Sequence, residues 1–154
     1  MKATTLLRND HSAVKKLFRA YEKAEKADDN EKKTSVFDEI ARELHIHPKV
    51  EEEIFYPAMR SAGNKKGVDE VPEALEEHVV VKFLLAQLKN LKPEDETYDA
   101  KVTVLIECVE HHTVEEESEM FPNAEKTLCD ARLRDLGARR DFIFGEGFGS
   151  QEAR

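Results

Sequence analysis

The chain has 154 residues, the size of a single domain with a sizeable core. It carries 24 Lys and Arg against 33 Asp and Glu, and the resulting net charge of −9 argues against nucleic acid or an anionic membrane as a partner. No apolar run is long enough for a membrane span or a secretory signal, and two cysteines are too few to staple a secreted fold. We therefore expect a reduced, cytoplasmic protein.

Segments with the apolar period of a helix follow one another along the chain. Their approximate ranges are 5–27, 34–61, 71–91 and 97–127, with a short fifth helix over 130–140. Breaks are expected at 28–30, in the loop 63–67 and at 92–96, and Pro72 suits the first turn of the third helix. Four long helices with short connections favour an all-α fold, an antiparallel up-down four-helix bundle. We assign residues 1–141 to this domain and 142–154 to a flexible Gly-rich tail.

Three prolines fall inside the expected helices. Pro57 and Pro122 lie late in the second and fourth helices, where each is expected to kink or shorten the last turns. Pro48 follows His47 directly in the second helix, and its missing N–H predicts a kink or break at that point.

The inward face of each long helix carries one histidine. These are His11, His47, His78 and His112. A lone histidine in such a position is more often a hydrogen-bonded core residue, but one from each helix indicates a shared site. Glu51 and Glu116 each follow a histidine by four residues, so both side chains of each pair point into the bundle, about 40° apart around the helix and about 6 Å along it.

Two buried carboxylates need a counter-charge. Burying an unpaired ionised carboxylate costs several kcal/mol, and no arginine shares the inward faces; the nearest candidate cation is Lys82. A metal bound by imidazoles and carboxylates converts this cost into binding free energy. Four nitrogens and two bridging carboxylates suit a pair of first-row ions, whereas copper(I), calcium and magnesium fit poorly. The alternative is a polar core without metal.

The second and fourth helices share an internal repeat. Residues 47–57 and 112–122 each contain His, Glu at the fourth and fifth positions after it, an aromatic residue at the ninth and Pro at the tenth. Chance in a Glu-rich chain does not readily explain the shared aromatic–Pro ending. The repeat indicates two half-bundles, each contributing one His-x-x-x-Glu helix.

Together with Asp10-His11 and Glu77-His78, these two segments resemble the hemerythrin-like, or HHE cation-binding, domain over about residues 5–140. The resemblance implies a four-helix bundle around two iron ions, a non-haem di-iron centre with carboxylate bridges and an oxo or hydroxo bridge. The ligands carried over by motif position are His11, His47, Glu51, His78, His112 and Glu116. The Glu-x-x-His pairs of ferritin-like di-iron proteins do not occur in this sequence.

One position departs from the family pattern. Oxygen-carrying hemerythrins have a second histidine four residues after the one on the third helix, where this chain has Lys82. This leaves three alternatives. One iron keeps an open coordination site, or Lys82 reaches that site instead of lying at the surface, or another side chain fills the site. The candidates for the last case are Glu52, Glu117, Tyr21, Tyr56, His45 and His111.

Three functions are compatible with such a centre. The resemblance favours a protein that binds O2 or a related small molecule, NO or peroxide, for sensing, transport or stress defence. The alternatives are a di-iron enzyme that decomposes peroxide, which is disfavoured because the sequence offers no separate acid–base pair, and a protein that stores or donates iron. A helical bundle with a purely structural zinc ion is a weaker fourth possibility. The sequence does not indicate which oligomeric state the protein adopts.

Overall fold

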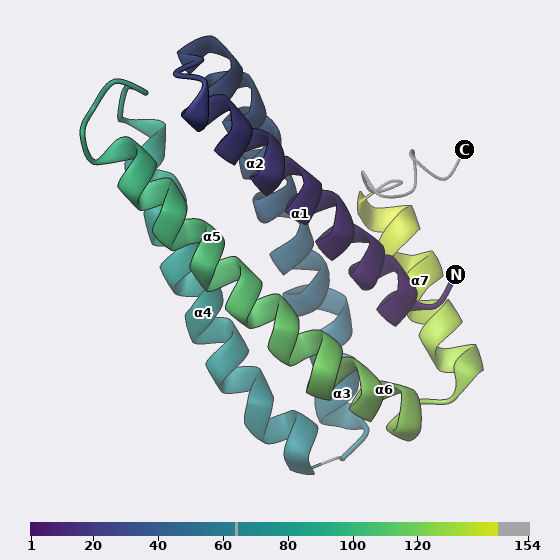
Figure 1. Ribbon diagram of the computed structural model, residues 1–154. Coiled ribbons are helices and arrows are strands. Elements are labelled where there is room, and N and C mark those ends of the chain that lie inside the picture. Colours follow the sequence, from purple (N-terminus) through teal and green to yellow (C-terminus); the bar gives the residue numbers. More distant parts are fainter. Residues whose placement is uncertain (64, 145–154) are drawn as a thin grey trace.

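The computed structural model describes residues 1–63 and 65–144, and within these ranges the chain forms helices and no strands (Figure 1). The elements are α1 (Ala3–Lys26), α2 (Asn30–Val50), the π-helical segment η1 (Glu51–Phe55), α3 (Tyr56–Ser61), α4 (Lys65–Lys89), α5 (Tyr98–Glu115), the π-helical segment η2 (Glu116–Met120), α6 (Phe121–Thr127) and α7 (Asp130–Phe144). The predicted all-α bundle with a short C-terminal helix is confirmed. Residues 145–154 of the predicted tail lie outside the described residues.

The second and fourth rods of the bundle are continuous helices that widen by one residue near their ends. In η1 the Tyr56 N–H donates to Glu51 O, and in η2 the Phe121 N–H donates to Glu116 O, both five residues back. Each wide turn directly precedes a proline, which has no N–H to donate and whose ring crowds the carbonyl four residues earlier. The α2 helix, by contrast, continues through Pro48, so of the kink or break predicted there the break does not occur.

The start of the third rod differs from the sequence prediction. The α4 helix begins at Lys65, so Gly67 and Pro72 lie inside it instead of in a loop and a first turn. Gly67 is buried, and a Cβ there would come within 2.6 Å of Met59 Cε, so a larger residue at this point of the α3–α4 contact would require the Met59 side chain to move. Tertiary packing therefore extends the helix beyond its local signals.

The four long rods form an antiparallel bundle, and α7 packs beside α1 near the start of the chain (Figure 1). The pairs α1–α2 and α4–α5 form the two halves of this bundle. Gly137 of α7 lies so close to the chain start that an added Cβ would be 2.1 Å from Met1 O. Thus a second glycine permits a second close approach, here between the fifth helix and the bundle.

The core consists of two apolar clusters. The α7-end cluster contains Ala3, Leu7, Val50, Ile54, Phe55, Tyr56, Ala58, Met59, Val71, Ala74, Met120, Phe121, Ala124, Leu128, Leu133 and Leu136. The loop-end cluster contains Val14, Leu17, Phe18, Tyr21, Val36, Phe37, Ile40, Leu44, Val81, Leu85, Leu88, Tyr98, Val102, Leu105, Ile106 and Val109. In each long helix the inward histidine falls between the stretches that supply these clusters, so a polar layer lies between two apolar ones.

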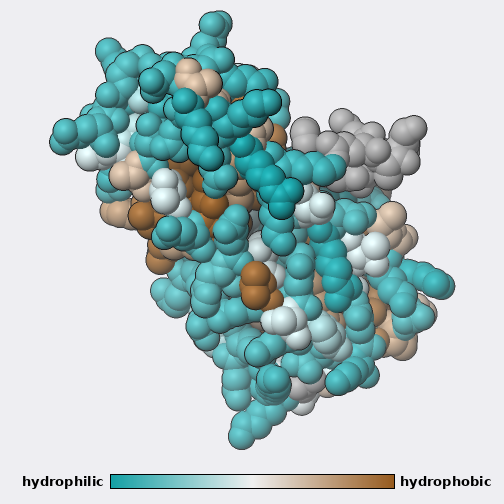
Figure 2. Space-filling view, in the orientation of Figure 1, coloured by the Kyte–Doolittle hydropathy of each residue, from teal (hydrophilic) through white to brown (hydrophobic). Residues whose placement is uncertain are grey.

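The outer surface of the bundle is largely polar. Hydrophilic residues cover most of the face in Figure 2, while apolar groups gather at its upper left and a few others lie elsewhere. Within the described ranges, none of the helices has the length and apolar character needed to cross a bilayer.

Candidate metal centre

Four imidazoles meet in the polar layer, one from each long helix. His11 lies on α1, His47 on α2, His78 on α4 and His112 on α5, and all four are buried. The Nε2 atoms of His11 and His47 are 3.1 Å apart, and those of His78 and His112 are 3.2 Å apart. The imidazoles therefore form two pairs, one within each half of the bundle.

A carboxylate faces the outer nitrogen, Nδ1, of every ring. The Nδ1–O distances are 3.0 Å for His11 and Glu117, 3.3 Å for His47 and Asp10, 3.2 Å for His78 and Glu52, and 3.1 Å for His112 and Glu77. A neutral ring that donates its Nδ1 proton to a carboxylate keeps its lone pair on Nε2. Such carboxylate–histidine pairs orient imidazoles for metal binding and raise their basicity.

Positive charge is stabilised at both imidazole pairs. Two Nε2 lone pairs about 3 Å apart repel each other unless a proton or a metal ion lies between them. Burial lowers the pKa of His47, but the charge of Glu51 and the hydrogen bond to Asp10 outweigh it and raise that pKa to about 10. Burial also opposes protonation of His112, and Glu116 again outweighs it and raises the pKa. The layer therefore favours cations in spite of its burial.

The carboxylates of Glu51 and Glu116 lie between the two imidazole pairs. Their Oε1 contacts are His47 Nε2 at 3.2 Å and His78 Nε2 at 3.3 Å for Glu51, and His11 Nε2 at 3.3 Å and His112 Nε2 at 3.0 Å for Glu116. Each carboxylate thus contacts imidazoles from both halves, and Glu51 Oε1 also lies 3.8 Å from His112 Nε2. None of these contacts has hydrogen-bond geometry, and both Oε1 atoms are buried with no hydrogen-bond partner in the described part of the chain. An unsatisfied buried acceptor is costly, so these two oxygens call for a cation.

The donor set fits a pair of metal ions. Ligand atoms lie within 4.8 Å of one another in two groups, which are His11, His47, Glu51 and Glu116, and Glu51, His78 and His112. Two nitrogens about 2.1 Å from one first-row ion lie about 3 Å apart when they bind at right angles, as in both imidazole pairs. Imidazole with carboxylate suits zinc, iron and similar ions. The structure thus brings together all six residues that the sequence predicted as ligands.

Tyr56 bonds to both central carboxylates from the α7-end cluster. Its Oη lies 3.2 Å from Glu51 Oε2 and 3.1 Å from Glu116 Oε2, so its proton can be donated to either. Burial and the charge of Glu51 raise the pKa of Tyr56 well above its usual value, which keeps the phenol a donor. The equivalent residue in the other half is Phe121, which stacks on His11 but offers no hydroxyl.

A buried ion pair supports one histidine from behind. Arg140 of α7 places Nη2 3.2 Å from both carboxylate oxygens of Asp10, and Asp10 Oδ2 faces His47 Nδ1. The sequence gives no signal for Arg140, because this residue lies on a helix with no motif. Asp10 and Glu77 do carry a signal, since each is an acidic residue directly before an inward histidine.

Lys82 does not reach the inner carboxylates. Its side chain is 53% exposed, and Nζ lies 3.3 Å from Glu52 Oε1. The other residues that were candidates for the open coordination position lie in different places. Glu52 and Glu117 face the Nδ1 atoms of His78 and His11. Tyr21, a member of the loop-end cluster, donates to Asp99, while His45 is exposed and His111 is 63% exposed. Among these candidates, Tyr56 alone contacts Glu51 and Glu116.

A small cavity of about 30 Å³ borders the four imidazoles on the side of the loop-end cluster. Val14, Leu44, Val81 and Val109 line it, each three residues from a histidine. The polar groups of Thr113 and Asp10, which also line it, are already bonded to Glu110 O and to Arg140. The cavity is therefore apolar except where it meets the imidazoles and Glu51, and it has room for one or two water-sized molecules.

Comparisons with known proteins identify a family and several relatives of this chain. A family model for the hemerythrin HHE cation-binding domain matches residues 2–124. An uncharacterised protein of Mycobacterium tuberculosis is 30% identical over 138 residues, which are 89% of this chain and 81% of that protein. The crystal structure of the Mycobacterium kansasii homologue, a hemerythrin HHE cation-binding domain-containing protein, has a TM-score of 0.78 and 29% identity and covers 92% of this chain and 84% of that one.

A DNA nickase of Nostoc sp. is 31% identical over 128 residues, which are 83% of this chain. These residues make up 35% of the nickase, so the chain spans about a third of that protein's length.

Proposed function

The chain belongs to the hemerythrin HHE cation-binding family, and on this basis we propose that its polar layer binds two iron ions and presents them to a small diatomic molecule such as O2 or NO. The proposed ligands are His11, His47, Glu51, His78, His112 and Glu116. The observation that carries the proposal is the convergence of four Nε2 atoms on two buried Oε1 atoms that have no hydrogen-bond partner in the described residues.

The protein's own groups determine what the centre can do. Glu51 and Glu116 each contact both halves of the bundle, which is the placement expected of bridging carboxylates. The outer carboxylates keep the imidazole lone pairs directed inward, and Tyr56 can donate a proton in a hydrogen bond without losing it. Bound iron would supply a redox-active Lewis acid to this arrangement.

The cavity beside the imidazoles favours a diatomic ligand over peroxide. Val14, Leu44, Val81 and Val109 exclude water from one side, and no uncommitted donor lines the cavity among the described residues. Peroxide both donates and accepts hydrogen bonds. It could donate to Glu51, but no uncommitted donor in the described lining would replace the bonds that it accepts from water. Binding for sensing, transport or stress defence is therefore favoured over peroxide decomposition.

We do not extend a nucleic-acid function from the nickase relative to this chain. The match covers 35% of that protein, and a net charge of −9 is unfavourable for a phosphate backbone. We propose that the shared part is the cation-binding domain, and that a cytoplasmic protein without a nucleic-acid partner is the best description of the chain.

Metal analysis tests the centre. Protein loaded with ferrous iron without oxygen should hold about two irons per chain, as the two donor groups predict. Glu51→Ala or Glu116→Ala should reduce this content to half or less, whereas Glu53→Ala, at an exposed neighbour of Glu51, should leave it unchanged. Unchanged iron in both inner variants, or zinc without iron from an iron-replete host, would contradict the proposal.

Optical spectroscopy tests the ligand. A charge-transfer band should appear when O2 or NO is added to the iron-loaded protein and should disappear when the gas is removed. Val109→Leu should weaken this response while keeping the iron, because one added methylene nearly fills the cavity. Val104→Leu, at an exposed position of α5, is the matched control. Steady O2 release from peroxide without a reversible band would instead favour the enzyme.

A further inference from the structure

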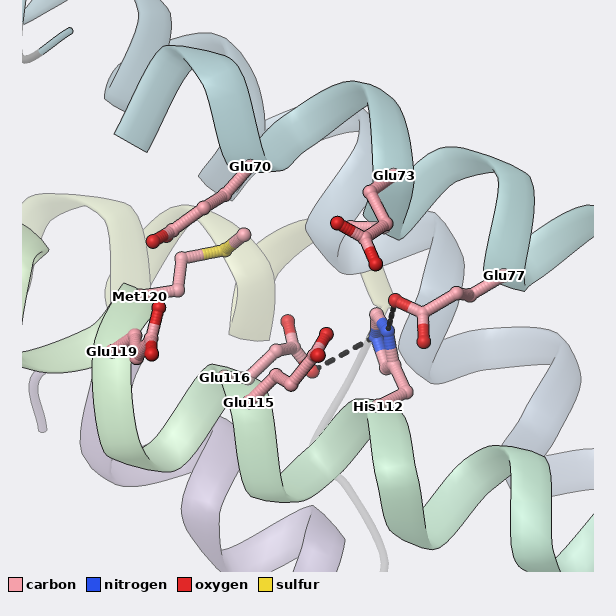
Figure 3. A pocket seen from close by; sticks show the side chains of 9 residues that line it. Glu70, Glu73, Glu77, His112, Glu115, Glu116, Glu119 and Met120 are labelled. Carbon is pink, nitrogen blue, oxygen red and sulfur yellow. Dashed lines mark hydrogen bonds and ion pairs between the residues drawn. The ribbon is translucent and has the colours of Figure 1, made fainter. Parts of the chain in front are cut away.

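A groove between α4 and the rod formed by α5, η2 and α6 is lined by glutamates (Figure 3). Glu70, Glu73 and Glu77 come from α4, and Glu115, Glu116 and Glu119 from the facing rod. The groove has a volume of about 70 Å³, and among its lining residues only His112 can carry positive charge. Lys66 Nζ lies 4.0 Å from Glu119 at one edge.

The groove leads to the buried centre. Glu116 and His112 line it and are also members of the two donor groups. Glu116 is 1% exposed, and its Oε1 has no hydrogen-bond partner in the described ranges. In Figure 3 the Glu116 and His112 side chains lie between the outer glutamates of the two rods. An unsatisfied, buried oxygen thus lies at the inner end of an acidic groove.

The outer carboxylates are poorly compensated. Both oxygens of Glu70 are buried without a hydrogen-bond partner among the described residues, and burial together with neighbouring Glu119 raises the pKa of Glu70. Close to the groove, Glu77, Glu115 and His111 place ligand atoms within 4.8 Å of one another. Repulsion among these groups is relieved when a cation lies between them.

In the α1–α2 half, buried apolar residues take the places of the groove glutamates. At the positions equivalent to Glu70, Glu73, Glu115 and Glu119, counted from the paired histidines, the α1–α2 half has Ala3, Leu6, Val50 and Ile54. All four are buried, and Leu133 and Leu136 of α7 belong to the same cluster as three of them. A fold that needed only to close its core would use apolar residues in both places. The acidic set on one side is therefore not required by packing.

We propose that this groove is the route by which divalent metal cations, ferrous iron in particular, reach the buried centre, with Glu70, Glu73 and Glu119 attracting and holding the incoming ion. Carboxylate oxygens can replace part of the water shell of such an ion before it meets the imidazoles. A cleft lined by one sign of charge also raises the local concentration of the opposite ion and speeds its association. This inference rests on the proposed metal centre and adds its path of loading.

Loading kinetics test the route. Metal-free full-length protein is mixed with Co²⁺, and separately with ferrous iron without oxygen, and uptake is followed by absorption and by final metal content. The variant E70Q/E73Q/E119Q removes three groove charges and no proposed ligand. Its initial rate at low salt should fall about tenfold or more, while its final content should equal that of the wild type. Added salt should slow the wild type more than the variant.

A matched variant separates the groove from overall charge. E22Q/E31Q/E96Q removes three exposed carboxylates from the loop end and should load at close to the wild-type rate. If the groove variant loads as fast as this control, or if it loses final metal content at an unchanged rate, the route is wrong. In both cases the proposed centre stands if the wild type still takes up two ions per chain. A wild type that takes up none overturns both proposals.

Discussion

The two halves of the bundle bring the same groups to the centre but differ in what covers them outside. Each half supplies a pair of histidines and one central glutamate, followed by a proline-terminated wide turn. Outside the α1–α2 half, apolar residues pack against α7, whereas outside the α4–α5 half, glutamates line an open groove. The inner layer is thus set by the chemistry of the ions, and the outer layers are free to differ.

The same contrast extends to the supports of the histidines. Asp10, behind His47, is buried and paired with Arg140. Glu77, behind His112, is 19% exposed and faces the exposed His111. In the α1–α2 half, the support of His47 is therefore a buried contact with α7. In the α4–α5 half, the support of His112 lies next to solvent.

The largest effect is expected when the buried ion pair between Asp10 and Arg140 is removed. Arg140→Met removes the guanidinium and leaves His47 as the remaining partner of the buried Asp10 carboxylate, so the free energy of unfolding of the metal-free protein should fall by about 3 kcal/mol. Glu77→Gln, the matched change at the open half, should cost about 1 kcal/mol or less. Denaturant unfolding measures both values. Equal losses would show that the halves are supported alike, and the double variant D10N/R140M should recover part of the loss.

A smaller effect is expected at Tyr56, an inner position where the two halves differ. Tyr56→Phe gives the first half the side chain that Phe121 provides in the second, and Glu51 and Glu116 then lose their donor. Partners of this kind contribute about 10–100-fold to metal affinity, so iron should pass to a competing chelator about tenfold more readily. Tyr98→Phe, in the loop-end cluster, is the control. Equal retention in both variants would mean that the phenol does not orient the carboxylates.

The smallest effect concerns the open groove. The pKa of Glu70 is raised by burial and by Glu119, so the folded state binds a proton more readily than the unfolded state, and ionisation of Glu70 destabilises the fold as the pH rises through the raised pKa. Glu70→Gln should therefore raise the Tm of the metal-free protein slightly at about pH 8 and lose this advantage at about pH 4. Thermal unfolding at both pH values, with Glu96→Gln as control, measures the difference. A lower Tm at pH 8 would contradict the repulsion.

Local patterns predicted the rods and the inner residues well because both follow the helical period. A side chain such as His47 or Glu116 faces inward whenever its helix does. Local signals failed where packing outweighed them. The sequence predicted a loop at Gly67 and a helix start at Pro72, yet α4 runs through both, and Gly67 lies close to Met59 of α3. A kink or a break was predicted at Pro48, but α2 continues through it, and the rod widens at η1, next to Pro57.

The amino-acid sequence by itself determined the helical bundle, the inward direction of one histidine per long helix and the placement of Glu51 and Glu116 one turn after two of them, since these depend on spacing within single helices. Only the tertiary structure decided which carboxylate faces each Nδ1, that Arg140 reaches Asp10, and that α7 covers one outer groove while the other stays open. The reason is that such contacts join residues far apart in the chain, and their distances are set by how whole helices pack, which no single helix encodes.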